Sequence, residues 1–238
     1  SGVVYGVTDV PRPDRFSRVN TFLHVNHEPR RPRYGVLLCI NGTGILNAWV
    51  KKTTVPDMSY PEVNRRCAEI PVGSEGVLML PFGNGAERML GNRYTGAEAI
   101  GLDLNRHDRF HLLRAAQEGI AFAFRYGMDV MRETGLRLRV IRAGYANLFL
   151  SPVFRQTLAT LCGADIELYN TDGALGAARG AALGAGLYAS REETFASLRK
   201  IDEVRPDPAD RDVLERGYAR WKAELENRLG RASHGTSV

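Results

Sequence analysis

Apolar residues in this chain recur with two different periods, and segments of the two kinds alternate along the sequence. Segments 1–10 and 18–25 have the composition of strands, and 34–40 is a nearly continuous apolar run typical of a buried strand. Segment 109–134 instead has apolar residues at every third or fourth position, which predicts a long helix. This alternation favours an α/β fold in which helices cover a central sheet.

Weaker patterns complete the predicted order of elements. A helix is expected after Gly42-Thr43-Gly44, with Ile45, Ala48 and Trp49 on one face. Further helices are predicted over 60–69, 152–161, from a cap at Asp172 to 188, and over 207–229, and strands over 77–80 (ended by Pro81), 138–141 and 165–168. The prediction is therefore one domain, 1–230, followed by a disordered tail, 231–238.

Composition excludes several classes of protein. The chain has 238 residues, of which 44% are hydrophobic and 25% charged, as in ordinary globular domains. It has no apolar stretch approaching the roughly 18 residues of a membrane helix. Its three cysteines, Cys39, Cys67 and Cys162, contain no Cys-x-x-Cys pair, so we expect buried thiols in a reducing cytoplasm rather than a disulfide framework or a zinc site.

The charge pattern argues against nucleic acid as a partner. The net charge is +5 and the isoelectric point is near 9.3, which raises a nucleic-acid binder as an alternative. Basic residues are interleaved with acidic ones, however, and the densest basic cluster, 12–33, lies among prolines with few aromatic residues to stack on bases. The histidine pairs, His24 with His27 and His107 with His111, lack a completing ligand set, so no protein-bound metal is expected.

Three phrases in a fixed order carry more information than any one of them. They are Leu-Pro-Phe-Gly-Asn-Gly-Ala-Glu-Arg at 80–88, Arg-Ala-Ala-Gln-Glu-Gly at 114–119 and Arg-Ala-Gly-Tyr-Ala-Asn at 142–147. Their order and spacing resemble the C-terminal domain of the FGGY carbohydrate kinases, closest to the xylulokinase-like members. The resemblance implies an RNase H-like domain of the actin, hexokinase and chaperone ATPase superfamily, with a mixed sheet flanked by helices. A dinucleotide-binding fold is disfavoured because no Gly-x-Gly-x-x-Gly follows a strand.

The resemblance also assigns phosphate-binding residues. Ser1 and Gly2 match the end of the family's Gly-Thr-Ser-Gly loop, which contacts the β- and γ-phosphates. Gly42-Thr43-Gly44 is a second small-residue turn between a strand and a helix, where backbone N–H groups can approach anions. Related kinases place a glycine five residues before a helix tryptophan against the nucleotide, and Gly44 precedes Trp49 by five.

The family's adenosine loop corresponds to 142–147, although Ala143 and Tyr145 interrupt its usual run of glycines. We expect Gly144 to lie against the sugar or the α-phosphate, and Asn147 and Ser151 to bond adenine. Tyr145 has two equally weighted interpretations: it stacks on the base or closes the pocket, or it is an aromatic residue that faces the core.

Other residues of these phrases are predicted to be structural. Glu87 and Arg88 can form charge pairs that hold the 82–88 excursion. Arg114 and Glu118 are four apart on the long helix and can pair, holding it against that excursion. Glycines at 176, 180 and 184 fall on one helical face, which implies close approach by another element.

By resemblance, the intact protein transfers the γ-phosphoryl group of ATP to a hydroxyl of a sugar such as D-xylulose, with magnesium held through the nucleotide phosphates. The catalytic base and most of the sugar pocket belong to an N-terminal domain upstream of these residues, so no catalytic residue is assigned and the fragment is expected to be inactive. Alternatives are a kinase for ribulose, glycerol or gluconate, or a nucleotide-binding scaffold without catalysis. The sequence leaves the oligomeric state open, a homodimer included.

Overall fold

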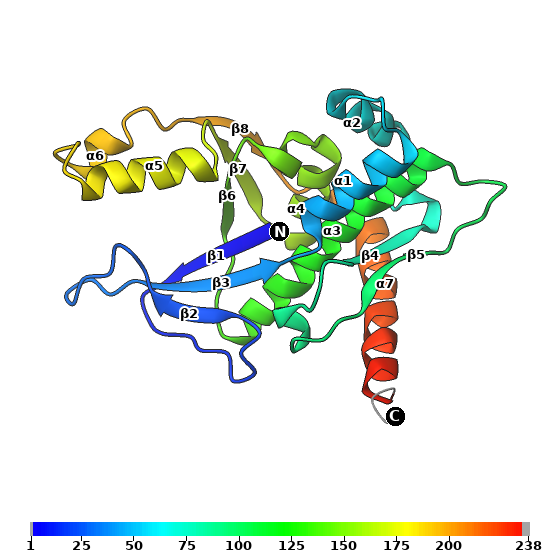
Figure 1. Ribbon diagram of the computed structural model, residues 1–238, viewed down its shortest axis with the longest axis horizontal. Coiled ribbons are helices and arrows are strands. Elements are labelled where there is room, and N and C mark those ends of the chain that lie inside the picture. Colours follow the sequence, from blue (N-terminus) through cyan, green and yellow to red (C-terminus); the bar gives the residue numbers. More distant parts are fainter. Residues whose placement is uncertain (1, 235–238) are drawn as a thin grey trace.

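The computed structural model describes the backbone of residues 2–234 and the side chains of residues 2–231. Its first sheet is antiparallel and joins β1 (Gly2–Thr8), β2 (Asn20–Leu23) and β3 (Tyr34–Ile40) in the order β1-β3-β2 (Figure 1). The apolar run at 34–40 becomes the central strand, because alternate residues of β3 are fully buried while its two neighbours lie at the edges. All three strands match predicted segments, with trimmed ends for the first two.

The described residues form two further sheets. β4 (Leu78–Phe82) pairs antiparallel with β5 (Gly96–Ile100). β6 (Val140–Gly144) pairs parallel with β7 (Asp165–Tyr169), and β7 pairs antiparallel with β8 (Lys200–Val204). The third sheet is therefore mixed, as expected for this fold class.

Seven α-helices and three short 3₁₀ turns connect the strands within the described residues. The helices are α1 (Thr43–Thr54), α2 (Tyr60–Glu69), α3 (Arg109–Glu133), α4 (Pro152–Cys162), α5 (Gly173–Gly184), α6 (Arg191–Thr194) and α7 (Pro208–His234), and the turns are η1 (Ser74–Gly76), η2 (Arg88–Leu90) and η3 (Asn147–Leu150). Together they alternate with the strands as the sequence predicts.

The core is built around α3. Asp108 caps this helix in a reciprocal capping box with His111, and the chain leaves it at Gly135, whose φ of 84° suits a residue without a side chain. Between these ends α3 is buried on nearly all sides, since it packs against β4, α1, α2 and α4, which are labelled in Figure 1. Trp221 of α7, which is fully buried, donates its indole N–H to Met79 O of β4 at 2.8 Å and fixes α7 to the same core.

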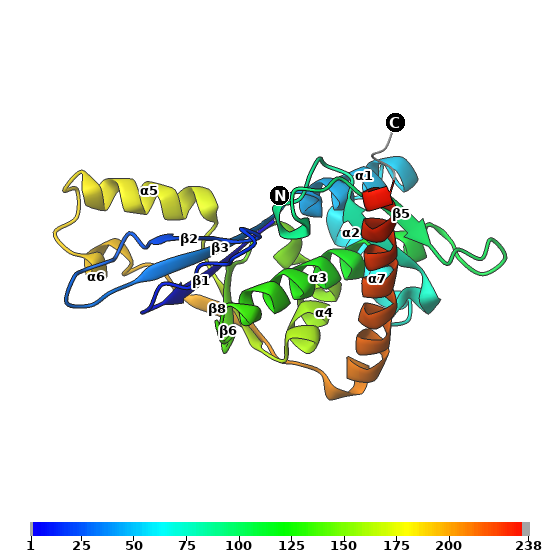
Figure 2. The ribbon, with the colours of Figure 1, turned by 90° about the horizontal axis from the view of Figure 1, so that it is seen from below.

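The glycine face of α5 was expected to lie close to another element, and within the described residues it does not. A Cβ placed on Gly176, Gly180 or Gly184 would meet no atom within 4 Å, so nothing in the described structure packs on this face. α5 ends at Gly184 rather than at 188, and with α6 it projects from the α3-centred core (Figures 1 and 2). Asp172 does cap the helix, accepting a hydrogen bond from Leu175 N at 2.8 Å.

Several boundaries also differ from the sequence predictions. The face of α1 that carries Ile45 and Trp49 is exposed, and the buried positions are instead Thr43, Leu46 and Val50. Pro81 does not end β4 but lies within it, opposite Ala97.

The sequence patterns did not predict β5, α6 or β8. α7 continues to His234, and residues 235–238 lie outside the described part of the chain. Among the described helices, none combines the length and apolarity that crossing a membrane requires.

Candidate nucleotide-binding site

A cavity of about 330 Å³ lies where α1, α2 and the turn before α4 meet. Each of these three segments contributes to its wall. The lining residues are Gly44 and Asn47 from α1, Tyr60 and Asn64 from α2, and Asn147, Leu148, Leu150 and Ser151 from the turn. Segments that are about a hundred residues apart in sequence therefore form one site.

The α1 side of the cavity is held by a buried carboxylate. Glu87 is fully buried, and it accepts hydrogen bonds from Asn41 N at 2.9 Å and Gly42 N at 3.2 Å. Burial raises the pKa of Glu87 against the opposing effect of these two N–H donors. Arg88 does not share this role, because its guanidinium donates to Asn20 Oδ1 at 2.9 Å. Glu87 thus anchors the β3–α1 turn through the backbone, in place of the predicted charge pair.

Gly42 needs its missing side chain for this turn to form. A Cβ there would lie 1.6 Å from Pro81 O, so β4 packs directly on the glycine. Helix α1 then starts with no side chain capping its first turn. A Cβ on Gly44 would meet nothing within 4 Å, which leaves open space beside the helix N-terminus, where backbone N–H groups favour anions.

A chain of side-chain hydrogen bonds supports the opposite wall. Ser151 caps α4, accepting a bond from Phe154 N at 3.4 Å, and its Oγ lies 2.5 Å from Gln117 Oε1 of α3. Gln117 Nε2 in turn lies 3.3 Å from Asn64 Oδ1 of α2. Ser151 and Gln117 are almost completely buried, so this chain fixes the turn, α3 and α2 relative to one another.

The lining is neutral, which limits what the cavity can hold. Within the described residues, none of the side chains around it carries a charge. Three asparagines can donate and accept hydrogen bonds, while Tyr60, Leu148 and Leu150 offer apolar surface. This combination suits a flat, uncharged and polar group such as a nucleobase better than a phosphate or a sugar acid.

The structure brings together three of the predicted site residues, Gly44, Asn147 and Ser151. The hydroxyl of Ser151 accepts a bond from Phe154 N and donates one to Gln117 Oε1. A bond from this hydroxyl to adenine stays a prediction. Asn147 lines the cavity from a left-handed backbone conformation, with a φ of 53°.

Other predicted residues lie outside the cavity wall. Gly42 and Thr43 are buried behind Gly44, and Gly2 packs against Phe124 and the hydroxyl of Thr43. The other residue predicted to contact the β- and γ-phosphates, Ser1, lies outside the described residues.

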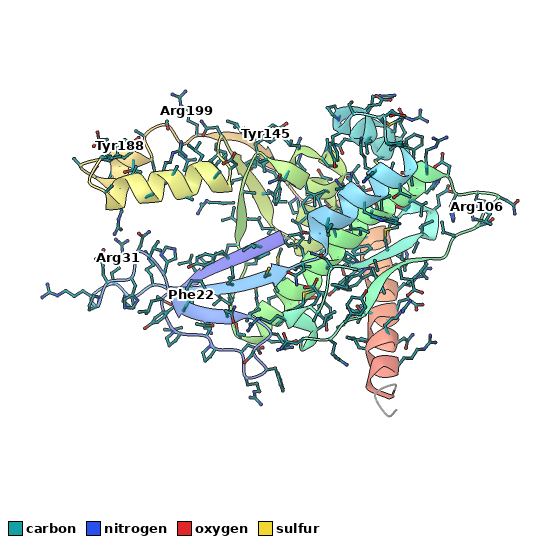
Figure 3. The ribbon with its side chains drawn as sticks, viewed as in Figure 1. Phe22, Arg31, Arg106, Tyr145, Tyr188 and Arg199 are labelled. Carbon is teal, nitrogen blue, oxygen red and sulfur yellow. The ribbon has the colours of Figure 1, made fainter. Side chains whose placement is uncertain are left out.

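Gly144 and Tyr145 belong to a different place in the fold. A Cβ on Gly144 would lie 2.2 Å from Thr171 O, so this glycine is packed against the turn before α5. Tyr145, which is labelled in Figure 3, lines a separate hollow together with Asp172 and Leu175 at the N-terminal end of α5. The guanidinium carbon of Arg155 lies 5.7 Å from the centre of its ring. The structure therefore separates the two residues from the cavity at Gly44.

Sequence reasoning missed Asn47, Tyr60, Asn64, Leu148 and Leu150. Tyr60 and Asn64 are four apart on α2, which puts them on one face, but no phrase of the sequence singles out that face. The three segments come together only in the tertiary structure, so the sequence alone does not reveal that they line one cavity.

Comparison with known proteins identifies the family. The fold is that of the actin- and hexokinase-like ATPases, and residues 4–189 match the model of the FGGY family of carbohydrate kinases, C-terminal domain. The chain therefore belongs to the FGGY family, which confirms the resemblance found in the sequence. Xylulose kinase of Haemophilus influenzae is 27% identical over 94% of this chain and 45% of that protein.

Two further relatives agree with this placement. L-xylulose/3-keto-L-gulonate kinase of Escherichia coli is 30% identical over 70% of this chain and 33% of that protein. The crystal structure of xylulose kinase from Rhodospirillum rubrum superposes with a TM-score of 0.79 at 24% identity, covering 97% of this chain and 46% of the other. The chain thus spans less than half the length of these relatives.

Proposed function

We propose that the cavity at Gly44, Asn64 and Asn147 binds the adenosine part of ATP. The observation that carries the proposal is the neutral, amide-rich wall beside the open N-terminus of α1. A base can fill the neutral cavity while the phosphates lie near the helix N-terminus, where the dipole favours negative charge. A kinase family implies ATP use, which supports the same assignment.

In the whole protein this domain serves a sugar kinase. The γ-phosphoryl group of ATP passes to a sugar hydroxyl, and the names of the relatives favour a ketose such as D-xylulose. Magnesium is held through the nucleotide phosphates, and the general base and most of the sugar pocket come from a further domain, as sequence reasoning expects. The chain by itself therefore binds nucleotide weakly and phosphorylates no sugar.

Two glycine substitutions test the site. Gly44→Val adds a side chain in open space at the cavity, so it should weaken ADP binding at least tenfold and leave the melting temperature nearly unchanged. Gly180→Val is the matched control, because its Cβ also meets nothing, yet it lies on α5 outside the cavity wall. Titration calorimetry with ADP measures the affinity of each variant and of the unchanged protein. Equal ADP affinities of both variants and the unchanged protein would contradict the proposal.

A further inference from the structure

We propose that Asn64 recognises the base in this cavity through its side-chain NH₂ group, held in one orientation by Gln117 and Ser151. The inference rests on the proposed adenosine site and adds a specificity-determining residue to it. Asn64 supplies the contact, and Gln117 is a positioning residue that lies behind the wall without lining it.

The orientation of Gln117 follows from the hydrogen-bond geometry at Ser151. The separation of 2.5 Å between Ser151 Oγ and Gln117 Oε1 fits an O–H···O bond and is too short for an N–H···O bond. Phe154 N already donates to the same Oγ, so the hydroxyl proton is free to go to Gln117. The carbonyl of Gln117 therefore faces Ser151, and its NH₂ group faces Asn64.

That arrangement fixes Asn64 in turn. Its Oδ1 accepts the N–H of Gln117 at 3.3 Å, which leaves Nδ2 as the donor not engaged by this relay. Turning the Asn64 amide over would bring two NH₂ groups face to face. Because Gln117 is 1% exposed, water cannot relieve such a conflict, and the orientation is locked by burial.

A fixed donor selects an acceptor at one position of the base. Adenine offers acceptors only at its ring nitrogens N1, N3 and N7, so the Asn64 NH₂ group is matched to one of these three. Replacing that nitrogen by C–H removes the acceptor and leaves the size and shape of the ring almost unchanged. The preference for adenine over the matching deaza analogue therefore depends on a single hydrogen bond, from Asn64 Nδ2 to one ring nitrogen.

The test combines protein variants with nucleotide analogues. The affinities of ADP and of 1-deaza-, 3-deaza- and 7-deaza-ADP are measured for the unchanged protein and for Asn64→Ala. The unchanged protein should bind one of the three analogues at least tenfold more weakly than ADP, and Asn64→Ala should bind that analogue and ADP equally. Asn105→Ala, an exposed asparagine in the 101–108 segment, should behave as the unchanged protein.

The positioning role of Gln117 has its own readout. Gln117→Met removes the group that orients Asn64, so the ratio between the affinities for ADP and the sensitive analogue should fall at least threefold. A merely structural role would weaken both nucleotides by the same factor and keep the ratio. Measurement below the melting temperature of each variant separates this effect from loss of fold.

Two results would overturn the inference. One is a discrimination that Asn64→Ala retains in full, and the other is equal binding of all three analogues and ADP by the unchanged protein. If the unchanged protein binds no ADP at all, the adenosine site itself fails, and that outcome is seen before any variant is made.

Discussion

Removal of the Glu118 carboxylate should destabilise the domain more than removal of an exposed acid. Glu118 is buried on α3, where it accepts bonds from Arg114 Nε at 2.7 Å, Gly73 N at 3.0 Å and Ser74 Oγ at 2.9 Å. Arg114 also donates to Cys67 O and Ile70 O. The pair therefore ties α3 to the end of α2 and to η1, rather than to the 82–88 excursion that the sequence suggested.

The structure gives the size of the effect in Glu118→Ala. Breaking a buried ion pair by removing one partner costs about 3–5 kcal/mol. Two effects lower this cost. The carbonyls of Cys67 and Ile70 still accept hydrogen bonds from Arg114 in the variant. Burial also raises the pKa of Glu118 despite the opposing effect of Arg114, which means that the ionised carboxylate is costly to bury and less is lost when it is removed. One effect raises the cost, since Gly73 N and Ser74 Oγ lose their acceptor. We expect the variant to lose about 3 kcal/mol, near the low end of the range.

Urea unfolding measures this loss when it is followed by tryptophan fluorescence, which changes as the buried Trp221 becomes exposed, whereas Trp49 is already exposed in the folded protein. For a slope of about 2–3 kcal/mol per molar, the midpoint should fall by about 1–1.5 M. Glu62→Ala is the control, because Glu62 makes the same kind of bond to Arg65 on the exposed face of α2. If both variants shift the midpoint equally, the buried pair does not carry the stability argued for it.

Two further predictions concern the same core. Glu87→Gln keeps an acceptor for the β3–α1 turn but cannot ionise. Burial raises the pKa of Glu87 above its ordinary value of 4.5, so the unchanged protein should lose stability relative to this variant as the pH rises above about 4.5. Urea midpoints of both proteins between pH 4 and 8 measure this, and a difference between the two midpoints that does not change with pH would contradict the prediction. Gly119→Ala places a Cβ 2.1 Å from Met79 O, so its thermal unfolding should show a loss of roughly 1–3 kcal/mol or more, and an unchanged melting temperature would mean that β4 does not pack on α3 here.

The sequence predicts the elements that carry their own periodic signal. α2 has the predicted bounds, and α3 differs by one residue at its C-terminal end, because capping and apolar spacing are local properties. β5 and β8 have no such signal. β5 consists mostly of small residues around one glutamate and has no buried position, and β8 carries three charged residues and is buried only at Val204. The family phrase at 142–147 pointed to Asn147 and Ser151, but only the folded chain shows that α2 completes the same cavity.

The glycines show why a pattern of small residues cannot be interpreted without the fold. Gly119 and Gly144 lie against backbone carbonyls of other segments, so a side chain at either position would collide with Met79 O or Thr171 O. Gly176 and Gly180, which have the clearer periodic pattern, lie beside open space. Both arrangements are consistent with a run of glycines in the sequence, because a missing side chain permits close contact without requiring it. Which glycines are needed for packing therefore depends on what the rest of the chain brings to each position.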